Sequence, residues 1–169
     1  YQVATAGLSA PDIAAPLRHI LRKQKNVEVR MATVTGIDAA AKRIALDDGG
    51  SLDFDFLLLA SGATHAYFGN DHWARHAPGL KTLDEARDLR RKLLLAFERA
   101  EAATDPAERE AWLSFAIVGG GPTGVELAGT LAEIARHTLQ DEFRNIDPAQ
   151  AKVRLLEAGP RVLASFPED

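Results

Sequence analysis

The stretch FAIVGGGPTGVELAG at 115–129 contains the residues whose types and spacing are best suited to chemistry. Gly119, Gly121 and Gly124 satisfy the pattern G-x-G-x-x-G, with Pro122 and Thr123 in the variable places. The first glycine permits a tight turn, the second lets a pyrophosphate approach the backbone, and the third lets the next helix lie close to the strand. The N-terminus of that helix presents unpaired N–H groups and a positive dipole end to phosphate. The stretch therefore predicts a pyrophosphate site.

The glycine pattern lies between two predicted strands, in the βαβ arrangement that dinucleotide sites require. A strand is predicted at 114–118, a helix from about Pro122 to Thr138, and a second strand at 152–157 that ends in Glu157. This acid could accept hydrogen bonds from the adenosine ribose and repel a 2′-phosphate, which favours NAD over NADP. Glu157 follows the glycines by more than the usual interval of about 20 residues, so we expect a helical extension at 136–150. The alternative is a glycine turn that serves packing alone.

Glu126 lies two residues after Gly124, in the first turns of the predicted helix. A helix dipole stabilises an anion there, and a bound cofactor would be near. Glu126 is therefore a candidate catalytic carboxylate, and the alternative is an ordinary acid at the start of a helix.

Three histidines and one serine suggest other chemistries. His72 and His76 have the i, i+4 spacing of a helical metal-ligand pair, and His65 is nearby, but the surrounding residues are typical of a loop and no acidic cluster accompanies them. Ser61 lacks the G-x-S-x-G context of an esterase nucleophile. We therefore predict no metal site. Because the chain contains no cysteine, a redox role would need a bound cofactor.

The first third of the chain contains signals for a helix and a small sheet. A capping box at Ser9 and helical spacing of apolar residues predict a helix through Leu21, irregular near Pro16. Alternating apolar residues predict a strand at 27–34, and two further extended runs around a Gly-containing turn complete an antiparallel meander over 27–55.

The next segments predict a buried strand and a long helix. FLLLASGA at 56–63 is apolar without alternation, as expected for a strand covered on both faces of a parallel sheet. Thr82 and Glu85 form a second capping box, followed by a helix to about Ala100. A Pro-Gly linker places one domain boundary near 76–82.

Composition limits the class of protein. A net charge of −4 at pH 7 disfavours an electrostatic nucleic-acid binder, and the basic run at 87–92 is interpreted as a solvated helix face. No uninterrupted apolar run is longer than that at 56–60, which is far shorter than the roughly 20 residues that span a bilayer, so we expect a cytoplasmic protein. Because the sequence starts at Tyr1 and stops just after a predicted strand and turn, we interpret it as an excised piece of a longer protein.

An ordered set of motifs resembles the flavoprotein pyridine nucleotide oxidoreductases with two dinucleotide-binding domains, and most closely the type II NADH dehydrogenases. The motifs, in chain order, are YQVATAGLS, TVTGID, FDFLLLASGATHAYFG, PGLKTLDEA, VGGGPTGVELAGTLAE and LLEAGPRVLASFPED. The resemblance implies an α/β fold, a Rossmann-like FAD/NAD(P)-binding fold of the glutathione-reductase-like tandem type, incomplete here and carrying the small antiparallel meander. It implies the C-terminal part of the first section of the FAD-binding domain at 1–78 and the N-terminal part of the NAD-binding domain at 79–169.

The same resemblance implies residue roles. Ala60, Ser61 and Gly62 would touch FAD, with Ser61 standing where similar proteins usually have threonine. Val34 matches a position whose backbone meets the adenine part of FAD, and Glu126 matches a carboxylate near the flavin and nicotinamide rings. The flavin's own glycine motif would lie upstream of Tyr1.

The implied activity is hydride transfer from NADH to FAD and electron transfer on to a quinone. The resemblance further implies a peripheral protein on the cytoplasmic face of a membrane, bound through segments outside this chain, and leaves a homodimer open. Two alternatives remain: a related reductase with a ferredoxin, thiol or oxygen acceptor, and a nucleotide-binding module without turnover.

Overall fold

The computed structural model describes residues 2–5 and 7–167. Its chain divides into a smaller unit, Ala14–Ala63, and a larger unit formed by Tyr1–Ile13 and Thr64–Asp169. No helix among the described residues has both the length and the apolar character needed to cross a membrane.

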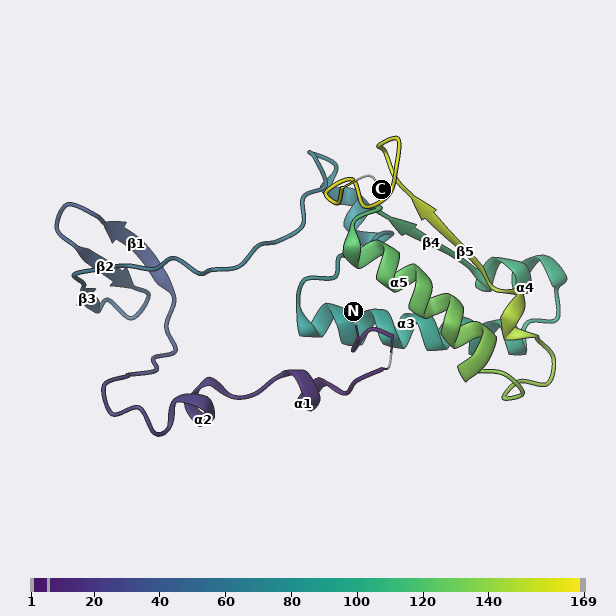
Figure 1. Cartoon of the computed structure of the whole chain (residues 1–169), viewed down its shortest axis with the longest axis horizontal. Helices are drawn as coiled ribbons and strands as arrows, with labels where there is room; N and C mark the ends of the chain where they lie inside the picture. Colours follow the sequence, from purple (N-terminus) through teal and green to yellow (C-terminus); the bar gives the residue numbers. More distant parts are fainter. Residues whose placement is uncertain (1, 6, 168–169) are drawn as a thin grey trace. The chain divides into compact units, whose positions relative to one another are not determined.

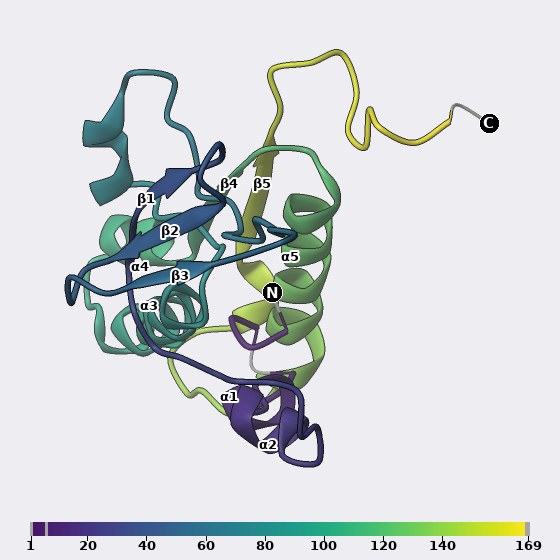
Figure 2. The same cartoon turned by 90° about the vertical axis from the view of Figure 1, so that its left-hand side faces the viewer.

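The smaller unit contains the predicted antiparallel meander (Figures 1 and 2). Its strands are β1 (Val34–Asp38), β2 (Arg43–Leu46) and β3 (Ser51–Asp53), in the order β1-β2-β3. Both neighbouring pairs are antiparallel, and Arg43 forms an ion pair with Asp53 across β2 and β3. The meander is confirmed as a three-stranded sheet.

The prediction of a strand at 27–34 is wrong for all but its last residue. Pairing between β1 and β2 ends at Val34 opposite Leu46, and the Asp47 N–H donates to the Thr33 carbonyl just beyond. The chain then turns over 47–50 into β3. Residues 27–32 therefore have no strand opposite them, and a strand forms only where its backbone finds a partner.

The predicted buried strand at 56–63 is also wrong. These residues have no regular secondary structure, and the side chains of Phe56 and Leu58 are 95% and 88% exposed. Continuous apolar composition favours a strand only where neighbouring strands and covering helices remove it from water. The described strands of this unit pair only with one another.

The single helix predicted from Ser9 is two short ones. Helix α1 (Ala10–Ile13) begins where the Ser9 N–H and hydroxyl both donate to the Asp12 carboxylate, at 2.8 and 2.6 Å. Helix α2 (Leu17–Leu21) begins after Pro16, which is extended with ψ 130°. Proline lacks an N–H and disfavours helical geometry in the residue before it, so the helix stops short of Pro16.

The larger unit contains the predicted long helix and the βαβ unit. Besides α1, its elements are η1 (Asp71–Arg75), α3 (Leu83–Ala102), α4 (Pro106–Trp112), β4 (Ser114–Val118), α5 (Pro122–Glu133), η2 (Ile134–Thr138), η3 (Pro148–Gln150) and β5 (Lys152–Leu156). Helix α3 starts with the predicted capping box. Strands β4 and β5 are parallel, and Figures 1 and 2 both show α5 running alongside them.

The core of the larger unit forms around Phe97, which is 1% exposed. Its ring lies 5.5 Å from that of Phe115 and 6.3 Å from that of Phe143. Leu131 and Ala135 from α5 and η2 are buried in the same cluster. This core fixes α3, β4 and α5 against one another and so holds the turn between β4 and α5.

The extension predicted at 136–150 is helical only at its two ends. A π-helical turn, η2, continues α5 to Thr138, and a short 3-10 turn, η3, precedes β5. Between them the chain is irregular, and the Glu101 carboxylate accepts the N–H groups of Asn145 and Ile146. Leu139 and Ile146 are buried in the core, so side-chain burial and the Glu101 carboxylate hold this segment where helical hydrogen bonds do not.

Candidate functional site

The three patterned glycines occupy different environments in the turn between β4 and α5. Gly119 has a φ of 107°, in the left-handed region that side chains disfavour. A Cβ on Gly124 would lie 1.9 Å from the Gly119 carbonyl oxygen, so the start of α5 is pressed against the turn. A Cβ on Gly121 would meet nothing within 4 Å. Open space therefore faces the middle glycine of the pattern.

The N-terminus of α5 has no side-chain cap. Gly121 is the N-cap residue and makes no side-chain hydrogen bond, Pro122 begins the helix, and the first turn contains no acid. Thr123 is exposed beside it. Uncapped N–H groups at the positive end of a 12-residue helix attract an anion, and the open space at Gly121 leaves room for one.

Glu157 lies beside this turn, at the end of β5. Its Oε2 accepts the Gly120 N–H at 2.6 Å and its Oε1 accepts the Gly159 N–H at 2.8 Å. The hydrogen bonds from Gly159 and Gly120 hold the pKa of the Glu157 carboxyl below its ordinary value of 4.5. The carboxylate is therefore charged at neutral pH and remains exposed to solvent.

Gly120 is the residue of this turn that the sequence pattern did not single out. Its N–H meets Glu157, and its carbonyl accepts the Leu163 N–H at 2.6 Å. A Cβ there would lie 2.9 Å from Glu157 Oε2 and 3.0 Å from Val162 Cγ1. The run of three glycines was the only signal for it, because the G-x-G-x-x-G pattern leaves its second place variable.

Glu126 is the fifth residue of α5, within the first turns of the helix as predicted but beyond its first turn. Its side chain is exposed and makes no hydrogen bond among the described residues. Dipole effects fall off within the first turn of a helix, so they do not explain a glutamate here. The position leaves the carboxylate open to a ligand approaching α5.

The four candidate FAD residues all belong to the smaller unit. Val34 pairs with Leu46 at the end of the meander, while Ala60, Ser61 and Gly62 lie in the irregular exposed segment. Gly62 has a φ of 76° with open space around it. An exposed hydroxyl and an open glycine backbone are compatible with a flavin contact, but no hydrogen bond among the described residues joins these positions to Val34.

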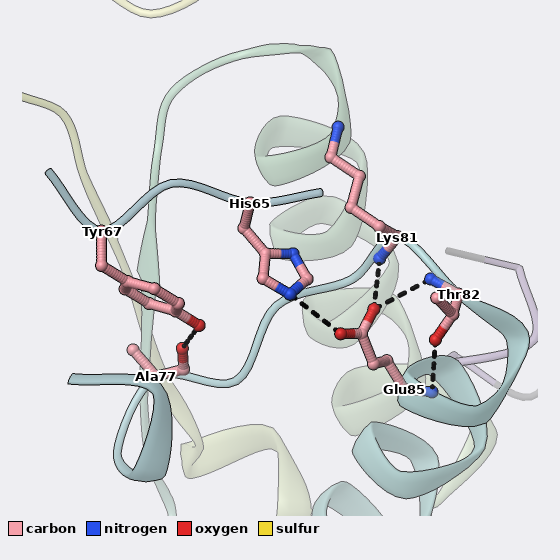
Figure 3. Close-up of polar contacts among 6 residues, drawn as sticks. All are labelled: His65, Tyr67, Ala77, Lys81, Thr82 and Glu85. Carbon is pink, nitrogen blue, oxygen red and sulfur yellow. Dashed lines mark hydrogen bonds and ion pairs between the residues drawn. The ribbon is translucent and has the colours of Figure 1, made fainter. Parts of the chain in front are cut away.

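His65 has a partner other than a metal (Figure 3). Its Nε2 lies 2.9 Å from Glu85 Oε1, while Glu85 Oε2 accepts the N–H groups of Lys81 and Thr82 at 2.8 and 2.9 Å. Those two backbone hydrogen bonds lower the pKa of Glu85. Among residues 2–5 and 7–167, no three histidine or acidic side chains are grouped to hold a metal. His65 thus fastens the chain at 65 to the start of α3.

Comparison with known proteins connects this geometry to a family. The family model described as pyridine nucleotide-disulphide oxidoreductase matches residues 1–169. Two type II NADH:quinone oxidoreductases of Mycobacterium tuberculosis, Ndh and NdhA, are 49% and 50% identical over 96% of this chain. The chain spans only 36% and 35% of their lengths.

Solved structures agree with the predicted fold. NDH2 from Plasmodium falciparum in complex with NADH superposes with a TM-score of 0.81 at 24% identity, covering 98% of this chain and 35% of that one. A ferredoxin reductase from Rhodopseudomonas palustris superposes with a TM-score of 0.63 at 20% identity, covering 99% of this chain and 35% of that one. The Rossmann-like FAD/NAD(P)-binding fold predicted from the sequence is confirmed.

Proposed function

Because the chain belongs to the pyridine nucleotide-disulphide oxidoreductase family, we propose that the protein carrying it is an FAD-dependent NADH:quinone oxidoreductase. Two mycobacterial relatives whose names state NADH:quinone oxidoreductase activity support this proposal, because their sequences are 49% and 50% identical to this chain. The structural observation that carries it is the turn between β4 and α5, with an uncapped helix N-terminus and open space at Gly121.

In this proposal the glycine turn binds the pyrophosphate of NADH. Gly119 and Gly124 give the turn its shape, and Gly121 leaves the space that the phosphates fill. Pro122 and Thr123 begin the helix whose positive end faces the phosphates. Among the described residues, no side chain caps this helix N-terminus, and the first turn of α5 has no acid.

Glu157 selects NADH over NADPH in this proposal. Its carboxylate is exposed and charged at the carboxyl end of β5, where the adenosine ribose of a dinucleotide lies in this type of fold. A carboxylate accepts hydrogen bonds from the ribose hydroxyls and repels a 2′-phosphate.

The flavin contacts are assigned to Val34, Ala60, Ser61 and Gly62, and the catalytic carboxylate to Glu126. FAD held there would supply a two-electron carrier between NADH and the quinone. The exposed Ser61 hydroxyl and open Gly62 backbone would contact the cofactor, while Glu126 would present charge or hold a proton beside the reacting rings. In domain terms, residues 1–78 belong to the FAD-binding part and residues 79–169 to the NAD-binding part.

The proposed setting is the cytoplasmic face of a membrane. A quinone dissolved in lipid requires access to the bilayer, and the resemblance assigns membrane binding to segments outside this chain. The resemblance leaves a homodimer open.

The test is an acceptor assay on the protein that carries this chain. NADH oxidation should be fast with a soluble quinone and much slower with ferredoxin, a disulfide substrate or oxygen alone. Faster NADH oxidation with ferredoxin than with quinone would assign the protein to the ferredoxin reductases instead. NADH binding without turnover on any acceptor would indicate a nucleotide-binding module.

A further inference from the structure

Both backbone polar groups of Gly120, at the centre of the glycine turn, form hydrogen bonds. Its N–H donates to Glu157 Oε2 at 2.6 Å, and its carbonyl accepts the Leu163 N–H at 2.6 Å. Gly120 is buried, although its neighbour Gly121 is exposed. The segment that follows β5 therefore fixes one half of the turn, while the half that faces the ligand stays open.

Glu157 organises that segment. Its other oxygen accepts the Gly159 N–H at 2.8 Å, so one carboxylate joins the turn to the first residues after β5. Farther along, the Arg161 guanidinium donates to the carbonyls of Ala164 and Phe166 at 3.2 and 2.9 Å. Residues 157–166 thus form a loop with its own hydrogen bonds, against which Gly120 packs.

We propose that Glu157 is a positioning residue for the pyrophosphate as well as the acceptor for ribose. By holding Gly120, its carboxylate fixes the path of the chain from β4 into α5, and with it the direction of the N–H groups at the start of the helix. The inference rests on the proposed function, since it concerns the same nucleotide site. It predicts that Glu157 contributes to the binding of a ligand that has no ribose.

The affinity for inorganic pyrophosphate distinguishes this positioning role from two simpler ones, in which Glu157 only binds ribose or only contributes negative charge. It has no hydroxyl for a ribose acceptor to bind, so a residue that acts only on ribose leaves its affinity unchanged. A nearby carboxylate also repels an anion, so loss of its charge alone would tighten pyrophosphate binding. Only a positioning role makes the affinity fall when the carboxylate is lost.

Two substitutions in the protein that carries this chain test the proposal. Glu157→Gln removes the charge and places an amide group that can accept only one of the two N–H bonds. Glu157→Asp keeps the charge but is one methylene too short to reach both Gly120 and Gly159. Glu133→Gln is the matched control, because Glu133 is exposed at the far end of α5 and its loss changes the net charge equally.

The dissociation constant of inorganic pyrophosphate is measured by calorimetry. We expect it to rise about fivefold in both Glu157 variants, as one charge-assisted hydrogen bond is lost, and to stay within error of wild type in Glu133→Gln. Unchanged or tighter binding in Glu157→Gln, or unchanged binding in Glu157→Asp, overturns the proposal.

Hydrogen exchange of the amides provides a readout that needs no ligand. In the nucleotide-free protein, the Gly120 amide should exchange faster in Glu157→Gln than in wild type, while amides in the centre of α3 keep their protection. Equal exchange at Gly120 overturns the positioning role. If the Gly120 amide of the wild-type protein is protected from exchange but the protein binds no NADH, the proposed function is wrong and the positioning of Gly120 is not.

Discussion

Glu126 is exposed on the second turn of α5, with no hydrogen bond from its side chain among the described residues. We predict that Glu126→Gln in the protein carrying this chain leaves NADH binding intact and slows electron transfer. The variant keeps the shape of the side chain and loses its charge, which alters the electrostatics beside a cofactor whose charge changes during turnover. Stopped-flow absorbance should show flavin reduction or reoxidation slowed roughly tenfold, about 1.4 kcal/mol in barrier.

Glu133→Gln, on the same helix, is the control for a general charge effect. If both phases of Glu126→Gln match wild type at every pH tested, Glu126 is an ordinary surface residue of α5.

Glu157 gives the second prediction at this scale. Glu157→Ala removes the proposed ribose acceptor and a charge that would repel a 2′-phosphate, so we predict that the preference for NADH over NADPH falls by roughly tenfold. The ratio of kcat/KM for the two nucleotides measures it. Arg161 will add little attraction for the 2′-phosphate, because its guanidinium already donates to backbone carbonyls of the 163–166 segment. An unchanged ratio would mean that another residue recognises the ribose.

At the scale of elements, the start of α3 depends on one carboxylate. Glu85 accepts the N–H groups of Lys81 and Thr82 and pairs with His65 (Figure 3). Its pKa is lower in the folded chain than the ordinary 4.5, so folding favours the charged form. The stability it contributes is present above about pH 4.5 and is lost as the pH falls through the lowered folded pKa.

We therefore predict that Glu85→Gln destabilises the protein near neutral pH and that the difference from wild type shrinks at about pH 3. Denaturant unfolding at the two pH values measures the difference. Thr82→Ala is the control, because it removes the hydroxyl half of the same cap and should cost about 1 kcal/mol at either pH. A Glu85→Gln effect that is equal at both values would show that its charge is irrelevant to the cap.

The elements that could be predicted from the sequence are those specified by nearby residues. The cap at Thr82, the glycine turn and the alternation of β4 and β5 with α5 follow from local patterns. The irregular conformation of 56–63 could not be predicted, because its apolar residues indicate burial without indicating whether any strand pairs with them. Pro16 indicated the break between α1 and α2. One continuous helix was predicted because the apolar residues on both sides of Pro16 have helical spacing.

The same distinction holds for the candidate site. The turn was predicted from the spacing of its glycines and Glu157 from its place at the end of a predicted strand, but the hydrogen bond between Glu157 and Gly120 joins residues far apart in sequence. No pattern specifies such a contact, because it depends on the path of the loop after β5. The roles of Glu126 and the candidate flavin residues remain predictions, since they concern ligands.

At the scale of the whole molecule, three of the four candidate flavin residues, Ala60, Ser61 and Gly62, lie in an exposed, irregular segment. We predict that the 169-residue chain, produced by itself, purifies without FAD, because Ala60, Ser61 and Gly62 are not held by neighbouring strands. The visible absorbance spectrum of the purified chain measures this directly. A stoichiometric amount of bound FAD would show that the chain completes the flavin site alone.

The central claim is that NADH reduces a flavin in the protein that carries this chain, with its pyrophosphate on the glycine turn. The measurement is anaerobic mixing with increasing concentrations of NADH, in which flavin absorbance gives both the extent and the rate of bleaching, in wild type, Gly121→Val and Gly129→Val. A side chain at Gly121 would fill the open space at the turn, whereas Gly129 is farther along α5 and also faces open space.

We predict that an equimolar amount of NADH bleaches the flavin in wild type and in Gly129→Val. Gly121→Val should keep its flavin, but at least about tenfold more NADH should be needed to reach half the maximal rate of bleaching. Absence of flavin from the wild-type protein, failure of NADH to bleach it, or the same dependence of the bleaching rate on NADH in Gly121→Val and wild type would refute this claim.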